Sequence, residues 1–236
     1  MSATPRPTPP TGLLATLFLF GAPALAMYVA TRFAIPNAVQ TSGWPPLIWW
    51  FAIGGFWVFT PLIFMALGGL RVETDETASL WRQRLRFRLN WGLHGRTILS
   101  AFAAIAALTV LIAILLPLVG VALERPAFLA LAPLSGREPW LWVTAVAFVG
   151  WNVFCQEILW RGVILPRQEV QFGETAWRLN AAGSVIFNLA FGSTALALML
   201  PALVIIPFVA QRTKSTPAAL LLHGSAQLAA LWFILR

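Results

Sequence analysis

Long apolar stretches limit the fold of this chain more than any other feature of its sequence. A helix needs about 20 apolar residues to cross the hydrocarbon core of a membrane. Only 10% of the 236 residues are charged and 59% are hydrophobic, whereas soluble domains carry about 25% charged residues. We therefore predict an all-α, polytopic membrane helix bundle of about seven transmembrane helices. The predicted spans lie near residues 13–32, 44–69, 98–122, 140–164, 179–195, 197–211 and 217–235.

The N-terminal region divides into a tail and a set of membrane helices. Residues 1–12 are rich in proline, and we expect them to form a disordered tail. Residues 13–139 then hold the N-terminal transmembrane helices, with a basic cytoplasmic loop at 71–97. The stretch LLATLFLFGAPALA ends in an Ala-x-Ala pattern like a signal-peptide cleavage site. Because the apolar run continues to Arg32, a retained first helix is favoured, although cleavage stays open.

Charge alternates between the segments that connect the spans. Basic residues gather in every second connection, and the others are neutral overall, as the positive-inside rule requires. We therefore expect an integral protein of the bacterial inner membrane with a cytoplasmic N-terminus. The net charge of +8 indicates topology and contact with anionic membrane lipids rather than nucleic-acid binding. The basic connections are 71–97, 165–178 and 212–216, and the neutral ones are 33–43, 123–139 and 193–197.

The connection 71–97 is the most strongly charged stretch of the chain. Its arginines at 82, 84, 86 and 88 alternate with the apolar residues Leu85, Phe87 and Leu89. This spacing favours a short strand-like or irregular amphipathic piece that lies on anionic headgroups. We expect His94, in the same connection, to be a solvated loop residue rather than a ligand.

Polar residues inside three predicted spans fall at a similar depth. Glu157 and Arg161 are four residues apart and share one helical face, as do His223 and Gln227. At a rise of about 1.5 Å per residue, Glu157, Asn188, His223 and Gln227 lie roughly 9–18 Å below the cytoplasmic face. Ionisable residues within a span face the bundle interior. We therefore predict one buried polar cluster, and a purely structural ion pair is the alternative for Glu157 and Arg161.

Three short motifs carry a resemblance to a known family. They read QEILWRG (156–162), FNLAF (187–191) and HGSAQ (223–227). In order and spacing they resemble the motifs of the CPBP intramembrane protease family, which includes CAAX-processing and bacteriocin-related endopeptidases. Those motifs are Glu-Glu-x-x-x-Arg, usually followed by Gly, then Phe-x-x-x-His, and finally His-x-x-x-Asn or His-x-x-x-Asp. The resemblance assigns residues 140–235 to a CPBP-like core domain.

The resemblance implies a helical bundle around a cavity that opens to the cytoplasm and the membrane. In the family, the first glutamate activates a water for peptide hydrolysis, while the histidines and the final asparagine position that water or stabilise the oxyanion. A carboxylate in a low dielectric and nearby hydrogen-bond donors suit this chemistry.

This chain departs from the family pattern at the positions that carry out the catalytic chemistry in the family. Gln156 replaces the water-activating glutamate, Phe191 replaces the second-motif histidine, and Gln227 replaces the final asparagine. Among the polar and charged positions of the motifs, only Glu157, Arg161 and His223 match. A zinc site usually needs three protein ligands. Glu157 and His223 supply two at most, so we expect no cofactor, and a metal at these two residues is the disfavoured alternative.

Two hypotheses of different classes follow from these departures. In the first, the chain is a catalytically degenerate, protease-like protein that binds or escorts a membrane protein or a lipid-modified peptide tail. In the second, it is an active intramembrane endopeptidase in which Glu157 is the base and His223 and Asn188 are its polar partners. The orientation of Glu157, toward His223 or against Arg161, discriminates between them. A small transporter or channel is a weaker third possibility.

Overall fold

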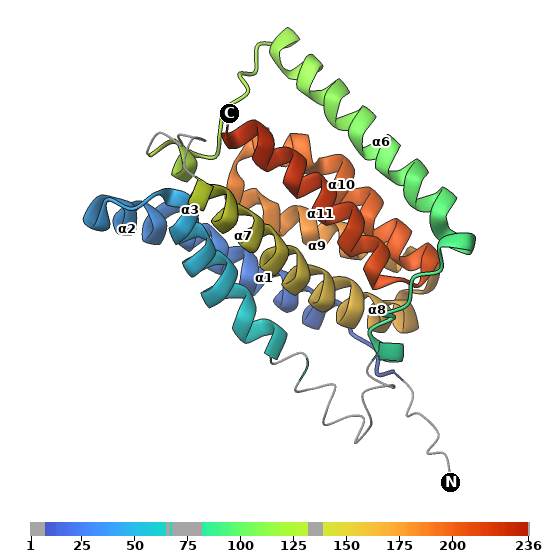
Figure 1. Ribbon diagram of the computed structural model, residues 1–236. Coiled ribbons are helices and arrows are strands. Elements are labelled where there is room, and N and C mark those ends of the chain that lie inside the picture. The colour runs from blue at the N-terminus through green and yellow to red at the C-terminus, as the bar shows by residue number, and fades with distance from the viewer. Residues whose placement is uncertain (1–7, 65–66, 68–81, 132–138, 236) are drawn as a thin grey trace.

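The computed structural model is a bundle of helices, shown in Figure 1, and it describes residues 8–64, 67, 82–131 and 139–235. Every regular element within these residues is helical, which confirms the predicted all-α class. Three elements, η1, η2 and η4, are π-helical, and η3, η5 and η6 are 3-10 turns. The elements are α1 (Leu13–Val29), η1 (Ala30–Ala34), α2 (Ile35–Ser42), α3 (Pro46–Trp49), η2 (Trp50–Phe59), α6 (Trp91–Leu118), η3 (Ala127–Ala130), α7 (Pro139–Glu157), η4 (Ile158–Ile164), α8 (Leu165–Phe172), η5 (Gly173–Thr175), α9 (Ala176–Asn188), η6 (Leu189–Phe191), α10 (Ser193–Thr213) and α11 (Thr216–Leu235).

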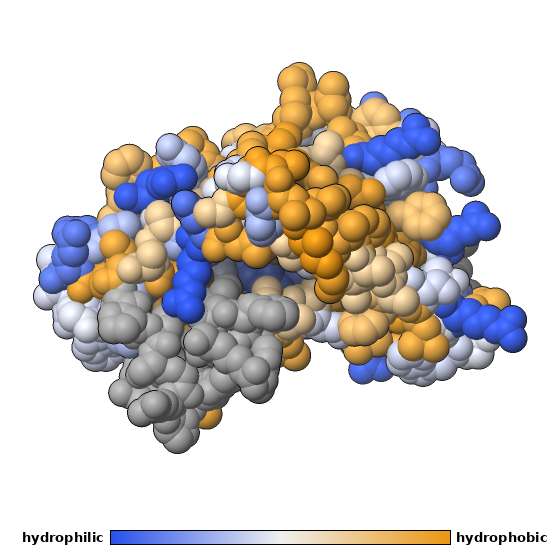
Figure 2. Space-filling view, turned by 90° about the horizontal axis from the view of Figure 1, so that it is seen from above, coloured by the Kyte–Doolittle hydropathy of each residue, from blue (hydrophilic) through white to orange (hydrophobic). Residues whose placement is uncertain are grey.

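The bundle has the surface of a membrane protein. Four helical stretches of the described residues are long and apolar enough to cross a membrane, namely Leu13–Ser42, Pro46–Phe64, Trp91–Leu118 and Ser193–Thr213. The helices α7, α9 and α11 take the positions of the other predicted spans. Figure 1 shows α11 ending at the opposite end of the bundle from the start of α1. On the face in Figure 2, apolar residues fill the middle and hydrophilic residues lie toward both sides.

The first helix is longer than predicted. We expected it to end near Arg32, but η1 and α2 continue it without a break to Ser42. The proline at position 36 lies directly after the π-helical segment η1 and does not interrupt this helix. The helix ends at Gly43, whose φ of 71° is in the left-handed region that favours glycine. The predicted connection 33–43 is therefore wrong.

The predicted loop 71–97 ends earlier than expected. Residues 71–81 of this loop lie outside the described residues, but α6 already begins at Trp91, so the predicted loop end at 97 is wrong. The side chain of Asn90 accepts a hydrogen bond from the backbone N–H of Leu93 at 3.2 Å and caps the helix. His94 is consequently a partly exposed residue in the first turn of α6 and not a loop residue.

The predicted connection at 193–197 is wrong as well. The chain turns at Gly192, with φ at 93°, and α10 begins directly after it and contains both Pro201 and Pro207. α9 has only 13 residues, which corresponds to about 20 Å and is shorter than a hydrocarbon core of about 30 Å. The chain therefore passes from α9 and η6 into α10 at Gly192, without the predicted connection.

Residues 85–88 form a short strap across one end of the bundle instead of a strand-like piece. The hydroxyl of Thr216 donates to the carbonyl of Leu85 at 2.6 Å, and the hydroxyl of Ser215 donates to that of Arg88 at 2.7 Å. Arg86 forms a bidentate ion pair with Glu169 of α8, at 2.6 and 2.8 Å. The strap is thus tied to α8 and to the start of α11.

The predicted tail, residues 1–12, lies partly outside the described residues, which begin at residue 8. Within the described part, Thr11 is buried, and its backbone N–H donates to the carbonyl of Arg167 at 3.3 Å. This part of the tail is therefore packed against α8 before the first helix starts.

Aromatic side chains around Trp160 form the centre of the larger core cluster. The Trp160 ring is buried and lies 5.0 Å from the ring of Phe20, 6.0 Å from that of Phe59 and 5.1 Å from that of Phe187. This contact set joins α1, η2 and α9 to the helix that carries the QEILWRG motif. It fixes the position of that motif within the bundle.

Candidate functional site

The centre of the polar cluster is a contact between α7 and α11. Nδ1 of His223 lies 2.7 Å from Oε1 of Glu157, although the two residues are 66 positions apart. Glu157 is fully buried and the His223 side chain is 6% exposed. The structure therefore brings together these two predicted site residues at hydrogen-bonding distance and at the same depth.

Arg161 approaches the same carboxylate oxygen from the other side. Its Nη1 lies 3.2 Å from Oε1 of Glu157, and both side chains are almost completely buried. The contact spans the junction at which the α-helix α7 becomes the π-helix η4. π-helical turns occur frequently at functional sites. Nη2 of Arg161 donates to the hydroxyl of Ser184 on α9 at 3.1 Å, which links a third helix to the cluster.

The hydrogen bonds indicate one tautomer for His223. An ionised Glu157 can only accept, so Nδ1 of His223 carries the proton in this contact. Nε2 is then an acceptor, and the amide nitrogen of Gln227 lies 3.4 Å from it. Both ring nitrogens of His223 are therefore engaged, while Oε2 of Glu157 is buried and has no hydrogen-bond partner among the described residues.

The other two predicted site residues bond within their own helices. The side-chain amide of Gln156 donates to the side-chain oxygen of Asn152, one turn earlier, at 2.9 Å. The side-chain amide of Asn188 donates to the backbone carbonyl of Ser184 at 2.8 Å. For Gln156 and Asn188, the hydrogen bonds of the described residues include none to Glu157 or His223.

Phe191, at the position of the family histidine, belongs to an aromatic group. Its ring lies 5.6 Å from that of Trp50, 6.3 Å from that of Phe128 and 6.0 Å from that of Phe187. The residue is only partly buried because it also borders a pocket at the end of the bundle that includes Arg32. This position therefore contributes packing and a pocket wall in place of an imidazole.

A second buried polar network lies beside the motif and was not predicted from the sequence. The side-chain nitrogen of Asn180 donates to the backbone carbonyl of Trp160 at 3.0 Å and to Oε1 of Gln168 at 2.9 Å. The side-chain nitrogen of Gln168 donates to the hydroxyl of Thr16 at 3.3 Å. The signal in the sequence was the run Asn180–Ser184–Asn188, which places polar residues four apart on one face of α9.

Gly162 allows the strap, residues 85–88, to pack closely against the QEILWRG motif. A Cβ atom added at this glycine would lie 3.2 Å from the Leu85 side chain and 3.6 Å from the Thr216 hydroxyl. The segment after Arg161 therefore has to be free of a side chain for the strap and α11 to pack closely against it. This packing gives a structural reason for the glycine that ends the QEILWRG motif.

The cluster is closed in this conformation, and its donors do not match a zinc site. Gln156, Glu157, Arg161, His223 and Gln227 are each at most 9% exposed. No group of three or more His, Cys, Asp or Glu side chains gathers in the part of the chain that the structure describes. Glu157 and His223 provide two donors, and Arg161 places a positive charge beside them. The arrangement can orient a hydrogen-bonded group or a water at Oε2 of Glu157, without a third ligand for a metal.

These features define an integral membrane protein with a polar centre buried between its helices. Comparison with protein families gives a more specific result. Residues 138–229 match the family described as type II CAAX prenyl endopeptidase Rce1-like, so this part of the chain is similar to that family. The match confirms the predicted CPBP family. The comparison with curated proteins and the one with solved structures gave no significant match.

Proposed function

We propose that this Rce1-like membrane protein is catalytically degenerate and binds or escorts a membrane protein or a lipid-modified peptide tail without cleaving it. The retained part of the motif then holds the helices in a binding-competent arrangement. The ligand is recognised by its apolar, membrane-embedded character.

The shared coordination of Glu157 is the observation that carries this proposal. Oε1 of its carboxylate contacts both Arg161 and His223, so its charge is neutralised and its direction is fixed. A general base needs a free lone pair within reach of the proton that it removes, and here only the buried Oε2 keeps one. At the neighbouring position, Gln156 has an amide that cannot accept a proton in this role. The geometry thus supports a structural use of the surviving motif residues.

A combined binding and cleavage assay tests the proposal. The purified full chain in detergent is incubated with a prenylated tail peptide and with the same peptide without the lipid. We expect the prenylated peptide to bind at least tenfold more tightly and to remain uncut. The double variant Gln156→Glu/Phe191→His restores the family residues and is the matched gain-of-function control. Cleavage by the wild-type chain would contradict the proposal.

The endopeptidase alternative is favoured by one specific observation. Oε2 of Glu157 is buried without a hydrogen-bond partner, and His223 lies next to the same carboxylate. A water at Oε2 could be activated there, with His223 as the positioning group. In this case the wild-type chain cleaves the peptide, and both Glu157→Gln and His223→Ala abolish the cleavage. Asn188→Ala then lowers the rate only if the rearranged site uses this amide.

The proposal includes a cytoplasmic N-terminus and an inner-membrane location. The chain has a single cysteine, Cys155, which is buried, so Cys155→Ala gives a background for labelling. In this background, Glu174→Cys and Glu124→Cys place a thiol at exposed positions at the two ends of the bundle. A membrane-impermeant maleimide added to intact cells should label the Glu124→Cys variant and should not label the Glu174→Cys variant. The reverse pattern would invert the orientation.

A further inference from the structure

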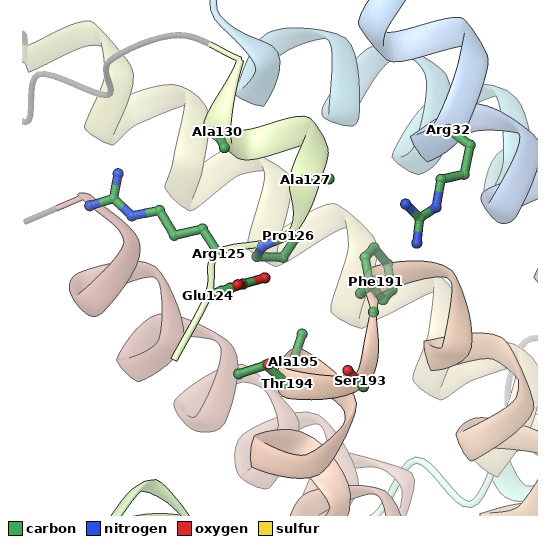
Figure 3. Close-up of a pocket in the computed structure, with 11 residues that line it drawn as sticks. Arg32, Glu124, Arg125, Pro126, Ala127, Ala130, Phe191, Ser193, Thr194 and Ala195 are labelled. Atoms are coloured by element: carbon green, nitrogen blue, oxygen red, sulfur yellow. The ribbon is translucent and has the colours of Figure 1, made fainter. Parts of the chain in front are cut away.

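A pocket of about 580 Å³ lies at one end of the bundle, away from the Glu157 cluster. Figure 3 shows its walls, which come from η1 in the first helix, from η3 and the segment before it, and from the start of α10 with the turn that leads into it. None of the residues that line it belongs to the polar cluster around Glu157. The lining residues are Arg32, Glu124, Arg125, Pro126, Ala127, Ala130, Phe191, Gly192, Ser193, Thr194 and Ala195.

Opposite charges lie on two sides of this pocket. In Figure 3 the Glu124 carboxylate turns into the pocket, and the Arg32 guanidinium lies on the far side, next to Phe191. Among the described residues, Glu124 has no side-chain partner, and the guanidinium of Arg32 has only the ring of Tyr28, 5.8 Å from its centroid. Arg125 also borders the pocket, but its side chain points away in the same view.

The floor of the pocket offers backbone donors. Ser193, Thr194 and Ala195 form the first turn of α10, a helix of 21 residues whose N-terminus has no side-chain cap. The first N–H groups of a helix lack intrahelical acceptors and favour an anion. The preceding residue, Gly192, has φ at 93°, and a Cβ added there would meet no atom within 4 Å, so the approach to these donors is open. The anionic part of a ligand therefore fits between Arg32 and this helix start.

We propose that this pocket binds a phosphoethanolamine group, with the phosphate between Arg32 and the first turn of α10 and the ammonium at Glu124. A simple anion would meet repulsion from Glu124, and a simple amine would meet repulsion from Arg32. Only a ligand that carries both charges satisfies both walls. A phosphate with a neighbouring primary amine does so, and the pocket volume lies within the range of small-ligand sites.

The position of the pocket agrees with a lipid source for this group. Arg32 lies about 20 residues, or roughly 30 Å, after the start of the apolar helix Leu13–Ser42, and Ser193 begins another apolar helix that is long enough to cross a membrane. The pocket therefore lies where the headgroups of a surrounding bilayer are found. A phosphatidylethanolamine headgroup and free phosphoethanolamine carry the same two charges, so the experiment has to separate the two sources.

Lipid titration of the delipidated full chain, followed by native mass spectrometry, tests this site. Phosphatidylethanolamine and phosphatidylglycerol with identical acyl chains are compared. We expect phosphatidylethanolamine to bind about tenfold more tightly than phosphatidylglycerol. A tenfold difference is the size expected for one charge-assisted hydrogen bond. Glu124→Gln should abolish this preference, and Arg32→Gln should weaken the binding of both lipids. Competition by soluble phosphoethanolamine identifies the headgroup alone as sufficient, whereas its failure to compete identifies the whole lipid as the ligand.

Arg125→Gln is the matched control, because it removes a charge beside the pocket whose side chain points away. It should change the affinities less than twofold. Ala127→Trp keeps every charge but fills the pocket, and it should remove the preference between the two lipids. Equal binding of both lipids to the wild-type chain, or an unchanged preference in Glu124→Gln, would overturn the proposal. The lipid preference is measured without the peptide and on variants that leave Glu157, Arg161 and His223 unchanged, so its outcome is separate from that of peptide binding or cleavage.

Discussion

The imidazole of His223 and the carboxylate of Glu157 lie in contact at 2.7 Å between α11 and α7. Arg161 completes this contact from the π-helix that follows Glu157. The buried carboxylate is therefore compensated by one cation and one hydrogen-bond donor, as a charge in a low dielectric requires. The three polar residues that match the family motifs are thus also a structural unit, and their roles in stability and chemistry can be tested separately.

Loss of Arg161 should destabilise the bundle strongly. Arg161→Met leaves Glu157 buried without its cation, and breaking one side of a buried ion pair costs about 3–5 kcal/mol. The free energy of unfolding in detergent should fall by this amount. Glu157→Gln/Arg161→Met removes both charges and should recover most of the loss. The exposed Arg178, changed to Met, is the control and should alter the stability by less than about 0.5 kcal/mol.

Gly183 should not tolerate a side chain. A Cβ atom at this position would lie 2.4 Å from the ring of Phe20, so α9 could not keep its distance from α1. Gly183→Ala should lower the free energy of unfolding by about 1–3 kcal/mol, as overpacking of a core does. Gly150→Ala, which meets no atom within 4 Å, should be neutral or slightly stabilising. Equal stability of the two variants would contradict the close packing of α1 and α9.

The strap should loosen when its anchors are removed. Arg86→Ala deletes the bidentate pair with Glu169, and Thr216→Val deletes the hydrogen bond to the Leu85 carbonyl. Each anchor is expected to contribute about 1 kcal/mol, so amide hydrogen exchange in residues 85–88 should become about fivefold faster. Arg82→Ala changes an exposed arginine beside the strap and serves as the control. Unchanged exchange in both anchor variants would show that the strap is held by other contacts.

Asn180 should matter more for stability than Asn188. Its amide joins the Trp160 carbonyl and Gln168, whereas the amide of Asn188 bonds only to the backbone of its own helix in the described residues. Asn180→Ala leaves two buried acceptors without this donor, which costs about 1–3 kcal/mol. Asn188→Ala should cost less than half of that. Thermal unfolding of the two variants in the same detergent gives the comparison, and a larger loss for Asn188→Ala would contradict it.

Hydropathy and spacing predicted the class of the protein and the core of the site. Apolar runs alone predicted the helical bundle, because a membrane requires helices that satisfy their own backbone. The four-residue spacings within Glu157–Arg161 and His223–Gln227, with their common depth, predicted the cluster. The helix ends were predicted less well, at Ser42, Trp91 and Ser193. A helix can continue beyond the apolar run, and its end depends on local caps and glycines.

The sequence by itself determined that the chain is a helical membrane protein, that its motifs resemble those of a protease family, and that Gln156 and Phe191 depart from them. Only the tertiary structure decided which groups meet. It placed Arg161 and His223 on the same oxygen of Glu157, turned Gln156 toward Asn152, and set Phe191 between an aromatic group and a charged pocket. The physical reason is that spacing along one helix fixes a face and a depth, whereas contacts between helices depend on how their surfaces pack.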